Sequence, residues 1–224
     1  MTFSSARPDL SAPSCNFSLV PILLASASPR RAHILETLGI PFRVVSSAFQ
    51  EPPPRPEDHA QPARYVEHLA REKARGCGDK NPHSLVLTAD TIVWHDGQIL
   101  GKPQDEDDAV QTLQRLRGRE HRVYTGVCLR HASNGQDAAG EQIEYSIAHE
   151  TTTVRFREVS DSWIAAYVAT GEPMDKAGSY GAQGKGAILV EAIEGDFWNV
   201  VGLPLRPLRE LLEKAGAPIE SFWK

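Results

Sequence analysis

Two kinds of hydrophobic pattern alternate along this chain, and together they predict strands and helices that follow one another. Apolar or β-rich stretches typical of strands occupy residues 19–26, 42–47, 84–90, 121–132, 144–156 and 187–195. Stretches with helical spacing occupy residues 29–38, 63–76, 104–118, 160–170 and 203–216. This order predicts an α/β fold in which a mixed β-sheet is flanked by helices, with a long hairpin whose turn lies at 133–140.

The stretch "LLASASPRR" at residues 23–31 joins the first predicted strand to the first predicted helix. Ser28 suits the N-cap of this helix, Pro29 suits its first position, and Gly39 suits its end. Arg30 and Arg31 then lie in the first helical turn, where the helix dipole disfavours cations. A bound anion would compensate for this repulsion, although a solvated first turn explains the spacing equally well.

The predicted helix at 63–76 is amphipathic, with one exception. Its apolar side carries Val66, Leu69, Ala70 and Cys77. Its polar side carries Arg64, Glu67, His68, Arg71 and Arg75. Lys73 lies in the middle of the apolar side, so its ammonium group either extends to an edge or reaches a negatively charged partner in a cavity.

Polar groups follow several predicted strands, which is where ligands bind in open α/β folds. Ser26–Arg31 follow the first strand, Asp90 and Thr91 end the strand at 84–90, and Lys102 follows a hairpin with Asp-Gly at its turn. Several cations with a carboxylate suit a polyphosphate and a divalent metal ion. Taken singly, Asp90 also fits a simple strand-end cap. The proline-rich segment at 50–62 predicts a surface loop over the cleft.

Composition restricts the class of protein. The net charge of -5 among 224 residues argues against general nucleic-acid binding. Three cysteines without CxxC spacing indicate a reducing, cytoplasmic location. No apolar run approaches the roughly 18–20 residues that span a bilayer, and no signal peptide is recognised, so we expect no membrane partner. Residues 1–19 predict a flexible tail and residues 20–224 a single domain.

Other common site patterns receive little support. The segment "GSYGAQGKG" at 178–186 does not have the spacing of a P-loop or of a dinucleotide fingerprint. The histidines form no HxxxH pair, and no GxSxG sequence is present, so neither a zinc site nor a serine hydrolase is indicated.

Several segments, in the same order, resemble the Maf family of nucleoside triphosphate pyrophosphatases. They are "LASASPRRAHILETLGIPF", "YVEHLAREKA", "TADTIV", "ILGKPQDEDDA", "VYTGVCL", "GEPMDKAGSYGAQGKGA" and "GDFWNVVGLPL", which together extend from about residue 21 to 212. The resemblance implies an ITPase-like α/β fold with a substrate cleft between two lobes. It also implies a homodimer that hydrolyses a nucleoside triphosphate at the α–β bond with Mg²⁺ or Mn²⁺.

The resemblance also implies roles for individual residues. The implied catalytic residues are Asp90, Lys73, Lys102 and Glu51. The implied substrate-binding residues are Ser26, Arg30, Thr91 and Gln183. Arg31 is added to them because of its charge and its place beside Arg30, although it could instead be a purely structural charge. The implied metal ligands are Glu51 and Asp90.

The segment "DKAGSYGAQG", which contains Gln183, resembles the branch of the family that acts on dTTP and UTP. A carboxamide can both donate and accept hydrogen bonds, so it can read the O4 and N3–H edge of thymine or uracil. Two alternatives remain open at this stage. One is a nucleotide-binding regulatory module linked to arrest of cell division. The other is the same chemistry on another base, such as 7-methyl-GTP.

Overall fold

A computed structural model describes residues 21–78, 83–132 and 143–223. Its centre is one seven-stranded sheet with the order β2-β1-β3-β5-β6-β7, and β4 pairs with β3 beside this path. The strands are β1 Ile22–Leu24, β2 Phe42–Val44, β3 Val86–His95, β4 Gln98–Leu100, β5 Glu120–Ala132, β6 Ile143–Phe156 and β7 Val190–Glu194. β1 is parallel to β2 and β3, whereas the pairs from β3 through β5 and β6 to β7 are antiparallel, so the predicted mixed α/β sheet is confirmed.

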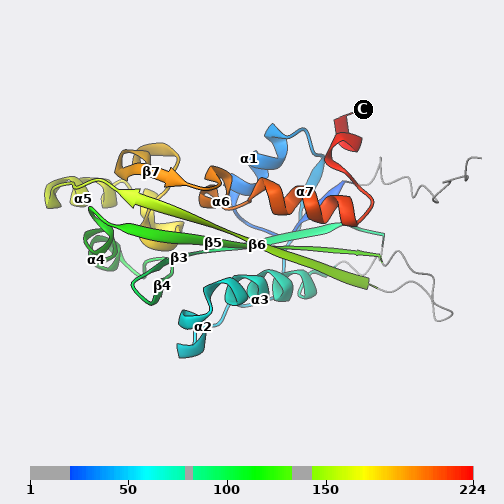
Figure 1. Cartoon of the computed structure of the whole chain (residues 1–224), viewed down its shortest axis with the longest axis horizontal. Helices are drawn as coiled ribbons and strands as arrows, with labels where there is room; N and C mark the ends of the chain where they lie inside the picture. The colour runs from blue at the N-terminus through cyan, green and yellow to red at the C-terminus, as the bar shows by residue number, and fades with distance from the viewer. Residues whose placement is uncertain (1–20, 79–82, 133–142, 224) are drawn as a thin grey trace, which may run out of the picture.

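Helices cover both faces of the sheet (Figure 1). They are α1 Pro29–Thr37, α2 Pro56–Ala60, α3 Pro62–Arg75, α4 Glu106–Leu116, α5 Asp161–Val168, α6 Phe197–Val201 and α7 Leu205–Lys214. Short 3-10 turns follow as η1 Glu172–Asp175, η2 Ala177–Ser179, η3 Gly184–Leu189 and η4 Ile219–Trp223. α1 and α7 lie on one face and α3 lies on the other, while α4 and α5 pack at the far end of the long strands.

The core divides along these layers. Ile34 of α1 and Leu208 of α7 join Leu24 and Leu87 of the sheet in one buried cluster. On the opposite face, Leu69 of α3 packs in a cluster with residues of β3 and β5. The apolar side predicted for this helix is confirmed, because Val66, Leu69, Ala70 and Cys77 are all buried. Alternate residues of β3 therefore enter different layers.

Two local predictions were wrong, and a third was right only in part. β3 does not end at Asp90 but continues to His95, because β5 pairs with it from Val86 to Trp94. The segment at 50–62 contains the short helix α2, which Pro56 begins and which Asp58 caps by accepting a hydrogen bond from the Arg55 backbone N–H at 2.8 Å. The predicted strand at 187–195 is confirmed over β7, but its first three residues, up to Leu189, belong to the 3-10 turn η3.

Two further predictions cannot be compared with this fold. The predicted tail at 1–19 and the predicted hairpin turn at 133–140 lie outside the described residues. Within the described ranges, no helix is long and apolar enough to cross a membrane.

Gly126 of β5 allows α3 to lie directly on the sheet, because a Cβ atom at this position would collide with the backbone of Val66. We expect Gly126→Ala to lower the free energy of unfolding by about 2 kcal/mol or more through overpacking. Urea denaturation would measure the change. Gly78→Ala is the matched control, since a Cβ atom at Gly78 meets nothing within 4 Å. Equal stability of the two variants would contradict this account.

Candidate functional site

The site lies where the central strand loses its neighbour on one edge. β1 pairs with β3 at Val86 and Leu87, and β4 pairs with it only from Val93 onward. Among the described strands, none pairs with this edge of β3 between residues 88 and 92. Asp90 and Thr91 lie in this gap, so the strand itself continues while its neighbours leave room for a ligand.

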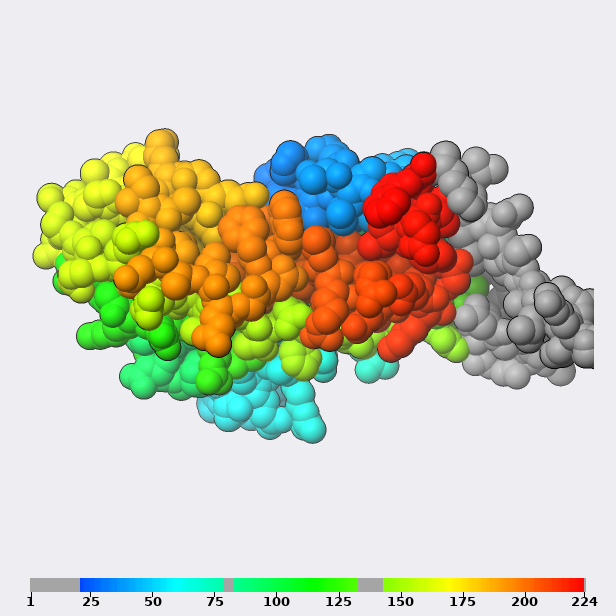
Figure 2. Space-filling model, turned by 45° about the horizontal axis from the view of Figure 1, so that its top comes forward, coloured from blue at the N-terminus to red at the C-terminus, as the bar shows by residue number. Residues whose placement is uncertain are grey.

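A pocket of about 1160 Å³ opens at this gap, and its lining includes every site residue predicted from the sequence. These residues are Ser26, Arg30, Arg31, Glu51, Lys73, Asp90, Thr91, Lys102 and Gln183. Pro52, Pro53 and Pro54 also line it, so the proline-rich segment does border a cleft. Figure 2 shows a hollow between α1 and the segment that contains η1 to η3, which form two sides of the opening.

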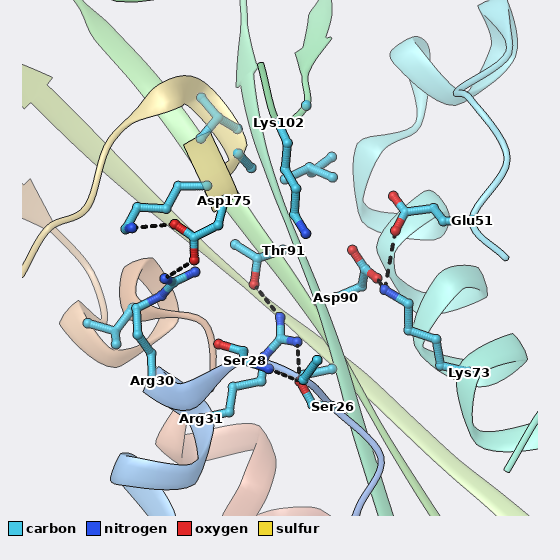
Figure 3. Close-up of a pocket in the computed structure, with 18 of the residues that line it drawn as sticks. Ser26, Ser28, Arg30, Arg31, Glu51, Lys73, Asp90, Thr91, Lys102 and Asp175 are labelled. Atoms are coloured by element: carbon cyan, nitrogen blue, oxygen red, sulfur yellow. Dashed lines mark hydrogen bonds and ion pairs between the residues drawn. The ribbon is translucent and has the colours of Figure 1, made fainter. Parts of the chain in front are cut away.

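Lys73 forms the centre of a charged cluster on the α3 face of the sheet (Figure 3). Its ammonium group contacts the Asp90 carboxylate and lies 3.2 Å from Glu51 Oε2. Burial lowers the pKa of Lys73, and the charge of Glu51 acts in the opposite direction. The lysine on the apolar side of its helix thus reaches negatively charged partners in a cavity, as one of the two interpretations predicted.

The depth of Asp90 makes this ion pair important. Only 6% of the Asp90 side chain is exposed, compared with 44% of the Glu51 side chain. A buried carboxylate without a partner is strongly destabilising, so Lys73 is the group that makes an ionised Asp90 tolerable there.

Arg31 connects three segments from the other side of β3. Its guanidinium donates hydrogen bonds to Ser26 Oγ at 2.9 Å, to Thr91 Oγ1 at 3.1 Å and to the Gly202 carbonyl at 2.8 Å. Burial, followed by the charge of Arg30, lowers the pKa of Arg31 to about 10, so it stays protonated at neutral pH. The side chain therefore positions the site as well as lining it.

Arg30 points into the opening and pairs across it with Asp175, whose carboxylate lies 3.0 Å away. Asp175 also pairs with Lys176, and both residues line the pocket. Sequence reasoning missed Asp175. The available signal was weak, because Asp175 was a single carboxylate just before the glycine-rich segment at 178–186.

The remaining residues come from separate elements. Lys102 follows β4 and directs its amine toward the space beside Asp90 and Thr91 (Figure 3). Thr91 accepts the hydrogen bond from Arg31 and lies 2.9 Å from Thr125 Oγ1. Gln183 stands immediately before η3 in the wall formed by the glycine-rich segment.

The donor set fits a magnesium-like ion. The carboxylates of Glu51 and Asp90 converge on one point, the ammonium of Lys73. Among the residues that the structure describes, no three His, Cys, Asp or Glu side chains form a group that could hold a metal by themselves. Mg²⁺ is commonly held by one or two carboxylates, with substrate phosphates and water completing its shell.

Comparisons of the sequence with known proteins give one consistent result. The family model described as "Maf-like protein" matches residues 21–215. A dTTP/UTP pyrophosphatase of Ruminiclostridium cellulolyticum is 46% identical over 198 residues, which cover 88% of this chain and 97% of that protein. Proteins of the same name from Moorella thermoacetica and Nitratidesulfovibrio vulgaris are 46% and 45% identical, and the matches cover 88% and 90% of this chain and 96% and 93% of theirs.

Arg31→Lys is expected to lower the free energy of unfolding by about 2 kcal/mol, because one ammonium group cannot replace three guanidinium donors in this fixed arrangement. Thermal and urea unfolding would measure the loss. Arg43→Lys in β2 makes the same change at an exposed position and is the control. If both variants were as stable as the wild type, Arg31 would not hold these segments together.

Proposed function

This chain belongs to the Maf family, and on that premise we propose that it hydrolyses dTTP and UTP at the α–β phosphate bond. The products are the nucleoside monophosphate and pyrophosphate. The names of the relatives support the class of base. Each relative described above is named dTTP/UTP pyrophosphatase, and the match to this chain covers nearly its full length. Modified pyrimidine nucleotides fit the same chemistry.

One observation carries the proposal. A single pocket at the open edge of β3 brings together five cationic side chains and three carboxylates from separate parts of the sequence. They are Arg30, Arg31, Lys73, Lys102, Lys176, Glu51, Asp90 and Asp175. A triphosphate needs compensation for several negative charges, and its hydrolysis needs a base close to the attacked phosphorus.

The phosphate chain is assigned to the α1 side of the pocket. Arg30 is available there once a phosphate oxygen replaces the Asp175 carboxylate, with which it now pairs at 3.0 Å. Ser28, Pro29 and Arg30 at the start of α1 line the same region, and backbone N–H groups at the start of a helix favour anions. Ser26 and Arg31 hold this turn against Thr91 and Gly202 through their hydrogen bonds.

Hydrolysis is assigned to the α3 side. Asp90 takes a proton from a water molecule, whose oxygen forms a bond to the α-phosphorus while the bond to the bridging oxygen breaks. Lys73 and Lys102 stabilise negative charge on the α-phosphoryl oxygens and on the departing pyrophosphate. Because Lys73 already holds Asp90 and Glu51, it also orients both carboxylates.

Glu51 and Asp90 are also the groups that would hold a divalent cation. When bound, such an ion would neutralise phosphate charge and favour ionisation of a water molecule. Gln183 and Thr91 are assigned to selection of the base of the substrate. A homodimer and a cytoplasmic location remain predictions from the resemblance and the composition, and sedimentation velocity would test the dimer.

The substrate panel is the decisive experiment for this function. We expect pyrophosphate release from dTTP and UTP in the presence of Mg²⁺ or Mn²⁺, with much lower kcat/KM on dCTP, dATP and 7-methyl-GTP. A preference for 7-methyl-GTP would instead favour the alternative in which the same chemistry acts on that nucleotide. Tight binding of dTTP without turnover of any nucleotide would instead favour a regulatory binding module.

Asp90→Asn keeps the shape of the side chain but removes its charge. We expect the rate of dTTP hydrolysis to fall at least about a hundredfold, which is typical for loss of a general base. Asp96→Asn is the control, because it makes the same change at the exposed β3–β4 turn, where asparagine also tolerates the positive φ of 48°. Turnover by Asp90→Asn close to the wild-type value would remove Asp90 from its assigned role.

A further inference from the structure

The segment that carries Gln183 has little regular structure to hold it in place. It consists of short 3-10 turns and contains Gly178, Gly181, Gly184 and Gly186. A residue that selects a base must nevertheless keep its carboxamide in a fixed position, because a misplaced polar group loses discrimination. The position of Gln183 must therefore come from contacts outside the segment.

Two side chains supply such contacts on both sides of Gln183. Before it, the Gly181 N–H donates to the Tyr167 hydroxyl at 3.2 Å. After it, the Lys185 and Gly186 N–H groups donate to Glu172 at 3.1 Å and 3.0 Å. The two side chains are themselves joined, because the Tyr167 hydroxyl donates to Glu172 Oε1 at 3.0 Å.

Tyr167 and Glu172 are closely packed against the segment and make hydrogen bonds with every group described above. Tyr167 is buried in α5, and a Cβ atom at Gly186 would collide with its hydroxyl. Partial burial disfavours the charged form of Glu172, but the N–H donors of Gly186 and Lys185 and the Tyr167 hydroxyl outweigh this and hold its pKa below the ordinary value. Glu172 is therefore an ionised acceptor at neutral pH, with no donor of its own.

We propose that Tyr167 and Glu172 act together as a clamp that positions Gln183 and thereby sets the preference for thymine and uracil over cytosine. Neither residue is among those that line the pocket, so both are positioning residues and not catalytic ones. The proposal rests on the proposed function and on the assignment of Gln183 to the base. The groups assigned to phosphate and to water activation lie on other elements, namely the β1–α1 turn, α3, β3 and the residues after β4.

The two variants that open the clamp are Glu172→Gln and Tyr167→Phe. An amide can satisfy only part of the three donors, since its NH₂ group must face one of them. Phenylalanine removes both the donor to Glu172 and the acceptor for Gly181. Glu191→Gln is the matched control, because it makes the same chemical change in the exposed ion pair with Arg155.

The measurement is the ratio of kcat/KM for dTTP to kcat/KM for dCTP. Cytosine presents an amino group where thymine presents O4, so this ratio reports the placement of the Gln183 carboxamide. We expect each clamp variant to lower the ratio about tenfold, the effect of roughly 1.4 kcal/mol of lost discrimination. The KM for dTTP should rise while kcat changes little. The double variant should lose no more than either single one, because the pair works as a unit.

Outcomes separate the clamp from the function on which it rests. The ratio compares two nucleotides on the same sample, so a lower folded fraction in a variant does not alter it. An unchanged ratio in both variants overturns the clamp while leaving the function intact, even if kcat/KM falls equally for both nucleotides. An unchanged ratio in Gln183→Ala also overturns it, because Gln183 would then not read the base. If the wild type hydrolyses neither dTTP nor UTP, the proposed function is wrong. The clamp is then tested by the ratio of the binding affinities for dTTP and dCTP.

Discussion

The site depends on one constraint in the sheet. β3 pairs with β5 without interruption from Val86 to Trp94, while its other edge is shared between the two short strands β1 and β4. The gap between β1 and β4 exposes the edge of β3 without breaking the strand. Side chains on neighbouring strand residues point to opposite faces, so Asp90 meets α3 and Thr91 meets Arg31. A single open edge thus gives one pocket access to two separately supported sets of polar groups.

Three carboxylates of this pocket are already paired with cations before any ligand arrives. Lys73 holds Asp90 and Glu51, and Arg30 holds Asp175. Such pairs reduce the cost of burying charge, and they can be exchanged when phosphate oxygens bring new partners. Arg31 differs because its three donors are used by the protein itself, which gives the two adjacent arginines of "SPRR" different environments.

Much of the fold could be predicted from local patterns. The helix of Lys73, the N-terminal helix after Pro29 and the long β5–β6 pair follow hydrophobic periodicity that survives in the structure. The C-terminal end of β3 could not be predicted. Asp90 and Thr91 are polar residues typical of a strand end, and only the pairing with β5 shows that the strand continues past them. The strand predicted at 187–195 begins later than expected because residues up to Leu189 continue the turn η3, whose start Glu172 holds by accepting the N–H groups of Lys185 and Gly186.

By itself, the sequence determined the family and predicted nine site residues that all line one pocket. Eight of them lie in the segments that resemble the family, and Glu51 lies outside these segments. Only the tertiary structure decided how these residues divide between the two sides of β3 and which charges pair. Asp175 and Glu172 illustrate the difference. Their partners, Arg30 and the backbone around Gln183, are brought to them by folding over 145 residues in one case and 14 in the other, and neither contact follows a local period.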